Sequence, residues 1–172
     1  YGHPIYFKKV KSKLVTDFKV FDDGFLSYIK TNPNNFQKKV IIMNNSYEEI
    51  DSITTTNYMM DAHESVYLSN GNWILLGKFN RTLDLTEYGG YPAATVTDNI
   101  IQEINSLGDV VFEWNTSEYF SLFDMPHHDI NSQSIDYAHI NSIHVDSDTT
   151  LVISSRHLDE ITKINRISGE II

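Results

Sequence analysis

The sequence of 172 residues contains no cysteine, so it has no disulfide framework, no thiolate nucleophile and no cysteine-based zinc site. Its longest apolar runs are four residues, Val40–Met43 and Trp73–Leu76, far short of the ~20 that a membrane-spanning helix needs. Basic residues are scarce, because 13 Lys and Arg stand against 23 Asp and Glu, giving a net charge of −10 at pH 7. We therefore expect no membrane span, and no nucleic-acid partner, since a polyanion would be repelled.

What the sequence does contain is a series of short apolar segments rich in Val, Ile, Tyr, Phe and Thr, which predicts a nearly all-β chain. Gly, Asn and Asp between the segments tolerate positive φ and indicate hairpin turns, so parallel βαβ units are not expected. A long loop from about Arg81 to Asp98 is predicted as an insertion between two strands. The predicted strands cover residues 16–20, 25–29, 39–44, 65–68, 73–78, 99–104, 110–114, 143–146, 151–155 and 161–165.

The strands and turns form a repeat. One unit begins at Asp61-Ala62-His63 and a second at Asp136-Tyr137-Ala138-His139, and a more degenerate copy precedes both. Units of four antiparallel strands at this spacing are typical of β-propeller blades. We predict one partial propeller domain over residues 1–172, with approximate blades at 14–60, 61–135 and 136–172, the last of them incomplete. An ordinary β-sandwich with similar turns is the alternative, which periodicity alone does not exclude.

Three blades are fewer than the ~4–8 of a closed propeller. Each blade buries its faces only against its neighbours, so an arc of three blades would expose two apolar flanks. We therefore expect the rest of the propeller to come from the same longer protein or from another chain.

Four residues are candidates for an oxyanion site. If the segment after Asp136 is extended, His139 and Asn141 share a face, roughly 6.5–7 Å apart along the strand. Arg156 follows a predicted strand, and its planar guanidinium matches the oxygens of sulfate or phosphate. His63 begins the preceding repeat, so it would converge with His139 on a common channel. The competing interpretations are a surface salt bridge from Arg156 to Asp159 or Glu160 and a turn-capping role for His139.

Other polar residues receive a simpler interpretation. Glu64 could orient or protonate an imidazole, but a solvated carboxylate at the rim is the favoured interpretation. The run His127-His128-Asp129 offers metal-ligand types, yet adjacent residues of an extended chain point to opposite sides, so a polar loop is expected rather than a metal site. His144 and His157 are expected to be surface histidines.

Several of these segments resemble the arylsulfotransferase family of PAPS-independent aryl-sulfate transferases. The resemblance is specific from about Asp61 to Ile172, although an Asp is more usual in the family where Glu64 stands. The segments that carry it are Asp61-Ala62-His63-Glu64 with Asn70-Gly71-Asn72, Asp136-Tyr137-Ala138-His139-Ile140-Asn141-Ser142-Ile143, Leu151-Val152-Ile153-Ser154-Ser155-Arg156-His157 and Ile164-Asn165-Arg166-Ile167-Ser168-Gly169-Glu170-Ile171.

This resemblance implies a six-bladed propeller that moves a sulfuryl group from an aryl sulfate to a phenol through a sulfated histidine, with no metal and no diffusible cofactor. His63, His139 and Arg156 would act in catalysis and Asn141 would bind the sulfuryl group, whereas the family's nucleophilic histidine would lie beyond Ile172. The isolated chain is then expected to be inactive, and the resemblance implies a periplasmic or secreted location. The alternative is a non-enzymatic propeller module that binds a ligand or a protein, because fold alone does not fix function.

Overall fold

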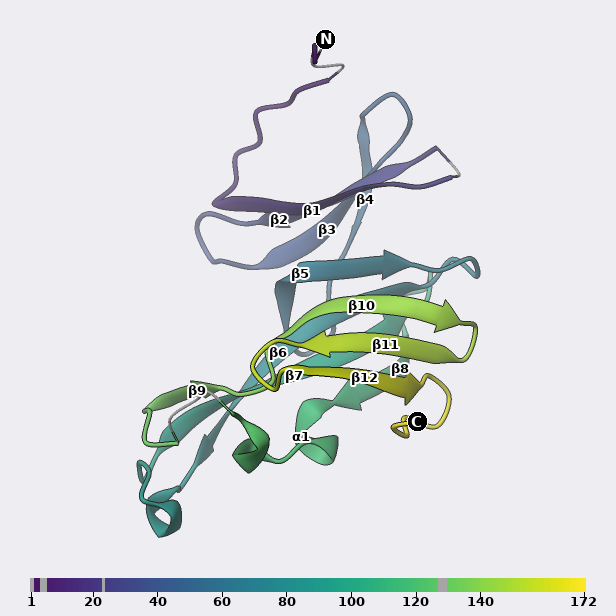
Figure 1. The fold of residues 1–172 in the computed structure, drawn as a ribbon. Coiled ribbons are helices and arrows are strands. Elements are labelled where there is room, and N and C mark those ends of the chain that lie inside the picture. The colour runs from purple at the N-terminus through teal and green to yellow at the C-terminus, as the bar shows by residue number, and fades with distance from the viewer. Residues whose placement is uncertain (1, 4–5, 23, 127–129) are drawn as a thin grey trace.

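Three sheets follow one another along the chain in the computed structural model, which describes residues 2–3, 6–22, 24–126 and 130–172 (Figure 1). The first sheet pairs its four antiparallel strands in chain order, as hairpin turns at short intervals dictate. These strands are β1 (Leu14–Val20), β2 (Leu26–Thr31), β3 (Lys38–Met43) and β4 (Glu49–Ile53).

The second sheet has four antiparallel strands and one short parallel strand, and the third sheet has three antiparallel strands. The expected all-β fold built from antiparallel sheets is confirmed. The second sheet contains β5 (Met59–Tyr67), β6 (Trp73–Leu83), β7 (Ala94–Ile104), β8 (Val110–Asn115) and β9 (Ser134–Asp136), and the third contains β10 (Ile140–Ser147), β11 (Thr150–Ser155) and β12 (Glu160–Asn165). The helices are single turns, α1 (Thr116–Tyr119), η1 (Thr86–Tyr88) and η2 (Leu122–Asp124).

The second sheet is buried on both faces, and this explains why the sequence of β6 is continuously apolar from Trp73 to Leu76. Alternate side chains of a strand point to opposite faces. Ile74 and Leu76 pack in a core shared with β10, β11 and β12, whereas Trp73 and Leu75 pack in a core shared with β2 and β3. The second sheet therefore lies between the first and the third, and the burial of these side chains holds the three sheets together.

Two features differ from what the sequence predicted. The loop predicted from about Arg81 to Asp98 is shorter than expected, because β6 and β7 pair without interruption from Trp73 opposite Ile104 to Leu83 opposite Ala94 and only residues 84–93 connect them. Arg81 and Asp98 themselves form an ion pair across this ladder, at 2.7 Å. Polar and charged side chains on the outer part of the hairpin resemble a loop in sequence. In addition, β9 pairs in parallel with β7, although hairpins alone were expected.

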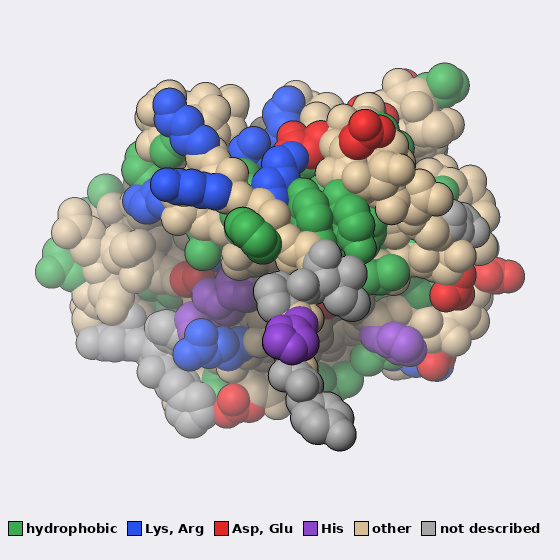
Figure 2. All heavy atoms as spheres, turned by 90° about the horizontal axis from the view of Figure 1, so that it is seen from above, with side chains coloured by type: hydrophobic (Ala, Val, Ile, Leu, Met, Phe, Trp, Pro, Cys, Tyr) green, Lys and Arg blue, Asp and Glu red, His purple; other side chains and the backbone are tan. Residues whose placement is uncertain are grey.

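Apolar side chains are exposed on both end sheets. Figure 2 looks onto the first sheet from the side of the N-terminus and shows apolar and lysine side chains next to each other. Phe18 and Val20 of β1 are 58% and 70% exposed, and Ile161 of β12 at the other end is 68% exposed. Among the described residues, no helix is long and apolar enough to cross a membrane.

Two glycines in turns differ in how tightly they are packed, and they can be compared by the same substitution. Gly169 and Gly108 both have positive φ, +79° and +87°. A Cβ on Gly169 would lie 2.8 Å from the Tyr119 hydroxyl, whereas a Cβ on Gly108 would meet no atom within 4 Å. Tyr119 cannot move away freely, because it stacks on Trp114, whose Nε1 donates a hydrogen bond to the Gly169 carbonyl at 3.0 Å.

We predict that Gly108→Ala lowers the free energy of unfolding by about 1 kcal/mol, the cost of a left-handed conformation for an L-residue. Gly169→Ala should lower it by about 2–3 kcal/mol, because the Tyr119 and Trp114 contact is also disturbed. Urea denaturation followed by tryptophan fluorescence measures both values. Equal losses for the two variants would contradict the packing described for Gly169.

Candidate active site

His63 is positioned by a wide bulge in β5. Met60 pairs with Gly77 and Ser65 pairs with Leu75, so four residues of β5 stand opposite a single residue of β6. Bulges of this kind redirect side chains and are common next to active sites. Within the bulge, the buried Asp61 carboxylate accepts a hydrogen bond from the His63 backbone N–H at 2.8 Å and lies 2.5 Å from His63 Nδ1. The sequence had indicated that His63 precedes a strand that begins at residue 65. In the structure His63 lies inside β5.

The first sheet fixes the bulge from outside. Ser65 donates two hydrogen bonds, from its backbone N–H and its hydroxyl, to Asp17 Oδ2 at 2.9 and 2.6 Å. The Thr16 hydroxyl donates to the Ala62 carbonyl at 2.7 Å. Glu64 forms an ion pair with Lys19, so its carboxylate is engaged by β1.

His139 lies in the tight connection between β9 and β10. Its φ is +49°, a left-handed conformation that costs energy for a non-glycine residue and is often found where function requires it. The connection is anchored by the fully buried Tyr137 and Ala138. His139 Nδ1 lies 2.7 Å from Asp136 Oδ2, at the end of β9. The sequence of this connection therefore presents an imidazole that is held by a carboxylate three residues earlier.

The structure brings together His63 of β5 and His139 of the connection between β9 and β10. Their ring centroids are 5.1 Å apart and their planes are inclined by 72°. This proximity was expected from the repeat, in which both residues open a unit. Because each ring is held through Nδ1 by a carboxylate of its own segment, the two imidazoles share one small region with defined orientations.

Asn141 and Arg156 stand close to His139 along the backbone. Asn141 is the extra residue of a bulge, since Ile140 pairs with Ser155 and Ser142 with Ser154, so strict alternation with His139 does not hold there. Its Oδ1 is buried and accepts no hydrogen bond from the described residues. Arg156 donates its backbone N–H to the His139 carbonyl at 3.1 Å. Its side chain is exposed and makes no hydrogen bond or ion pair within the part of the chain that the structure describes.

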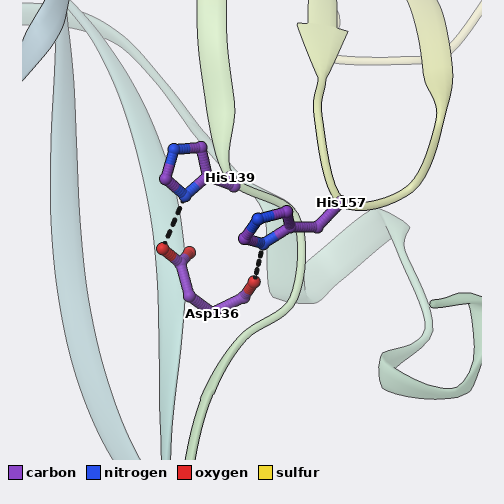
Figure 3. Close-up of side chains that lie close together, drawn as sticks. All are labelled: Asp136, His139 and His157. Carbon is purple, nitrogen blue, oxygen red and sulfur yellow. Dashed lines mark hydrogen bonds and ion pairs between the residues drawn. The ribbon is translucent and has the colours of Figure 1, made fainter. Parts of the chain in front are cut away.

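His157 belongs to the site, although the sequence suggested a surface histidine. It is half-buried, its ring centroid lies 4.5 Å from that of His139, and its Nδ1 lies 2.5 Å from the Asp136 carbonyl oxygen (Figure 3). The register of β10 and β11 places residue 157 beside the His139 connection, so correct strand pairing would have revealed it. His144 is exposed, as expected. His127, His128 and Asp129 lie outside the described residues.

Lys78 of β6 links the two carboxylates of the site. Its Nζ lies 2.9 Å from Asp61 Oδ2 and 3.8 Å from Asp136 Oδ2. Burial alone would raise the pKa of Asp61, but the Lys78 ammonium and the His63 ring more than offset this effect and hold the pKa below its usual value of 3.8. Asp61 is therefore ionised at neutral pH, and it orients both His63 and Lys78.

The hydrogen bonds at Nδ1 define the state of the histidine rings. A carboxylate ion and a carbonyl oxygen only accept hydrogen bonds, so Nδ1 carries the proton and the lone pair of a neutral ring is at Nε2. Burial lowers the pKa of His139 below 6.5, and the nearby Lys78 and His157 lower it further, while the hydrogen bond to Asp136 opposes the shift. His139 is thus mainly neutral at pH 7, with Nε2 buried and without a hydrogen-bond partner among the described residues.

The chain was also compared with known proteins. The family model described as Arylsulfotransferase (ASST) matches residues 4–172. The chain belongs to this family. The match extends well before Asp61, where the resemblance in sequence motifs was weak. Searches of curated proteins and of solved structures gave no match for this member of the arylsulfotransferase family.

The state of His139 in this arylsulfotransferase-family chain gives a direct prediction. Asp136→Asn removes the carboxylate that raises the pKa of His139, so this pKa should fall still further below 6.5. Asp146→Asn is the control, because Asp146 is exposed on β10 and pairs with Lys163 instead. Titration of the histidine ring signals by long-range ¹H–¹⁵N NMR, in buffer with EDTA, measures the shift. An unchanged or raised pKa of His139 in Asp136→Asn would show that the carboxylate does not hold this ring.

Proposed function

We propose that this chain forms the sulfuryl-binding part of an aryl-sulfate sulfotransferase, which moves a sulfuryl group from a phenolic sulfate ester to a phenolic acceptor through a sulfohistidine. The observation that supports this most strongly is the convergence of His63 and His139, each held through Nδ1 by a carboxylate. Membership of the arylsulfotransferase family agrees with it. In this proposal Asn141 and Arg156 complete the set of groups around the sulfuryl oxygens.

The imidazoles bind the sulfuryl group in their protonated state. A protonated ring donates Nε2–H to a sulfuryl oxygen, and its charge balances the negative charge that spreads over these oxygens in the transition state. His139 is mainly neutral before the anion binds, so it takes up a proton at Nε2 together with the anion, whose negative charge favours the protonated ring. The Arg156 guanidinium, which is exposed and has no partner among the described side chains, adds a planar pair of donors to the same anion.

We also propose that the three sheets are blades of a propeller, completed by residues outside this chain. Two observations support it: the second sheet packs against a neighbour on each face, and the outer sheets expose apolar side chains such as Phe18, Val20 and Ile161. Blades bury such faces against the next blade. In this arrangement the nucleophilic histidine comes from one of the further blades.

Binding of 4-nitrophenyl sulfate to the chain, measured by calorimetry, tests the sulfuryl site. Loss of a charge-assisted hydrogen bond costs about 1.5–3 kcal/mol, so we expect His139→Ala and Arg156→Ala each to weaken binding about 10- to 100-fold. Arg156→Lys should also bind more weakly, because an ammonium does not reproduce two parallel contacts. His144→Ala, at an exposed position of β10, should bind like the parent chain. Equal affinity in all four variants would contradict the proposed site.

Release of 4-nitrophenol with and without phenol tests the assignment of roles in the same samples. The chain alone should release no more 4-nitrophenol than buffer, because the proposal places the nucleophile outside it. Turnover that is lost in His139→Ala or His63→Ala and retained in His144→Ala would overturn that assignment and identify a nucleophile within this chain. If a protein that contains this chain together with the further blades binds 4-nitrophenyl sulfate but shows no turnover, a binding module is favoured over an enzyme.

A further inference from the structure

A second chemical possibility lies in the cluster formed by Asp136, His139 and His157. Each of the three half-buried residues offers one ligand atom that lies within 4.8 Å of the ligand atoms of the other two. They come from two segments, the connection before β10 and the turn after β11, which are joined by backbone hydrogen bonds. His157 N–H donates to the Ala138 carbonyl at 3.2 Å, and Arg156 N–H donates to the His139 carbonyl at 3.1 Å. The cluster is therefore held by the backbone of both segments.

The donor set is characteristic of a particular class of ion. Two imidazoles with one carboxylate suit Zn²⁺ and neighbouring divalent transition metals, whereas Mg²⁺ and Ca²⁺ prefer sites made of oxygen atoms. Three protein ligands also leave one position of a tetrahedral ion for water or for an oxygen of another ligand. Figure 3 shows a nitrogen of His139 directed at the Asp136 carboxylate and a nitrogen of His157 directed at the Asp136 backbone carbonyl oxygen.

The cluster contains a polar atom that lacks a partner. Asp136 Oδ1 is buried and has no hydrogen-bond partner among the described residues. In folded proteins such buried atoms are nearly always paired, and an ion bound by this carboxylate, His139 Nδ1 and His157 would supply the missing partner.

We propose that Asp136, His139 and His157 bind one divalent transition-metal ion of the Zn²⁺ class. Bond lengths of ~2.0–2.2 Å to zinc place tetrahedral ligand atoms about 3.4 Å apart, so small side-chain rotations from the present arrangement are sufficient. The ion replaces the hydrogen bond between His139 and Asp136, and the proton of the neutral His139 ring moves from Nδ1 to Nε2 as Nδ1 binds the ion.

Some charges around the cluster oppose the binding of a cation and others favour it. Lys78 Nζ, 3.8 Å from Asp136 Oδ2, opposes a cation, but it is held more closely by Asp61, at 2.9 Å. The His63 ring, 5.1 Å from the His139 ring, is itself held by Asp61. The net charge of −10 favours a cation over the whole surface.

Isothermal titration of the chain with ZnCl₂, in a buffer without chelating groups, tests metal binding. We expect one equivalent to bind, with at least tenfold weaker binding in His157→Ala and in Asp136→Asn and with unchanged binding in His144→Ala. MgCl₂ should give no heat of binding. Titration with Co²⁺ should give visible absorption bands of a four-coordinate ion, and these bands should be lost in His157→Ala. Circular dichroism of each variant confirms that a loss of binding does not reflect unfolding.

Zn²⁺ binding that is equally strong in His157→Ala, Asp136→Asn and the parent chain would overturn the metal site, as would the absence of binding by the folded parent chain.

Discussion

The ammonium group of Lys78 is the contact on which the arrangement of the site depends. It lies between the carboxylates of Asp61 and Asp136, which come from the β5 bulge and from the end of β9. Two carboxylates this near to one another repel unless a cation stands between them. Each carboxylate in turn holds one imidazole through Nδ1, so Lys78 indirectly sets the distance between the His63 and His139 rings.

The sheets supply the rigid support for this bridge. Because the second sheet packs on both faces, β6 cannot shift without disturbing two hydrophobic cores, and Lys78 is fixed with it. The strained elements of the site, the bulge at Asp61 and the left-handed His139, are the places where the backbone departs from regular pairing. Burial in the sheets offsets the cost of these departures, and the departures direct the side chains toward one another.

Much of the fold was predictable, because alternating apolar segments and Gly or Asn turns determine strands and hairpins locally. The proximity of His63 and His139 was also predictable, since both open a repeat. Lys78, Asp136 and His157 were not recognised as parts of the site, because their roles depend on contacts between segments. The register of β10 against β11 brings His157 to His139, and the parallel pairing of β9 with β7 brings Asp136 near Lys78. Sequence patterns report neither non-local pairing nor bulges.

The central claim is that one small anion binds between the imidazoles of His63 and His139. A crystal structure of the chain soaked with selenate tests it most directly, because the anomalous signal of selenium locates the anion independently of its density. The account predicts a selenate within hydrogen-bonding distance of Nε2 of both rings, with Asp61 and Asp136 still bound to Nδ1. Well-ordered rings with selenate bound only elsewhere on the chain would contradict it.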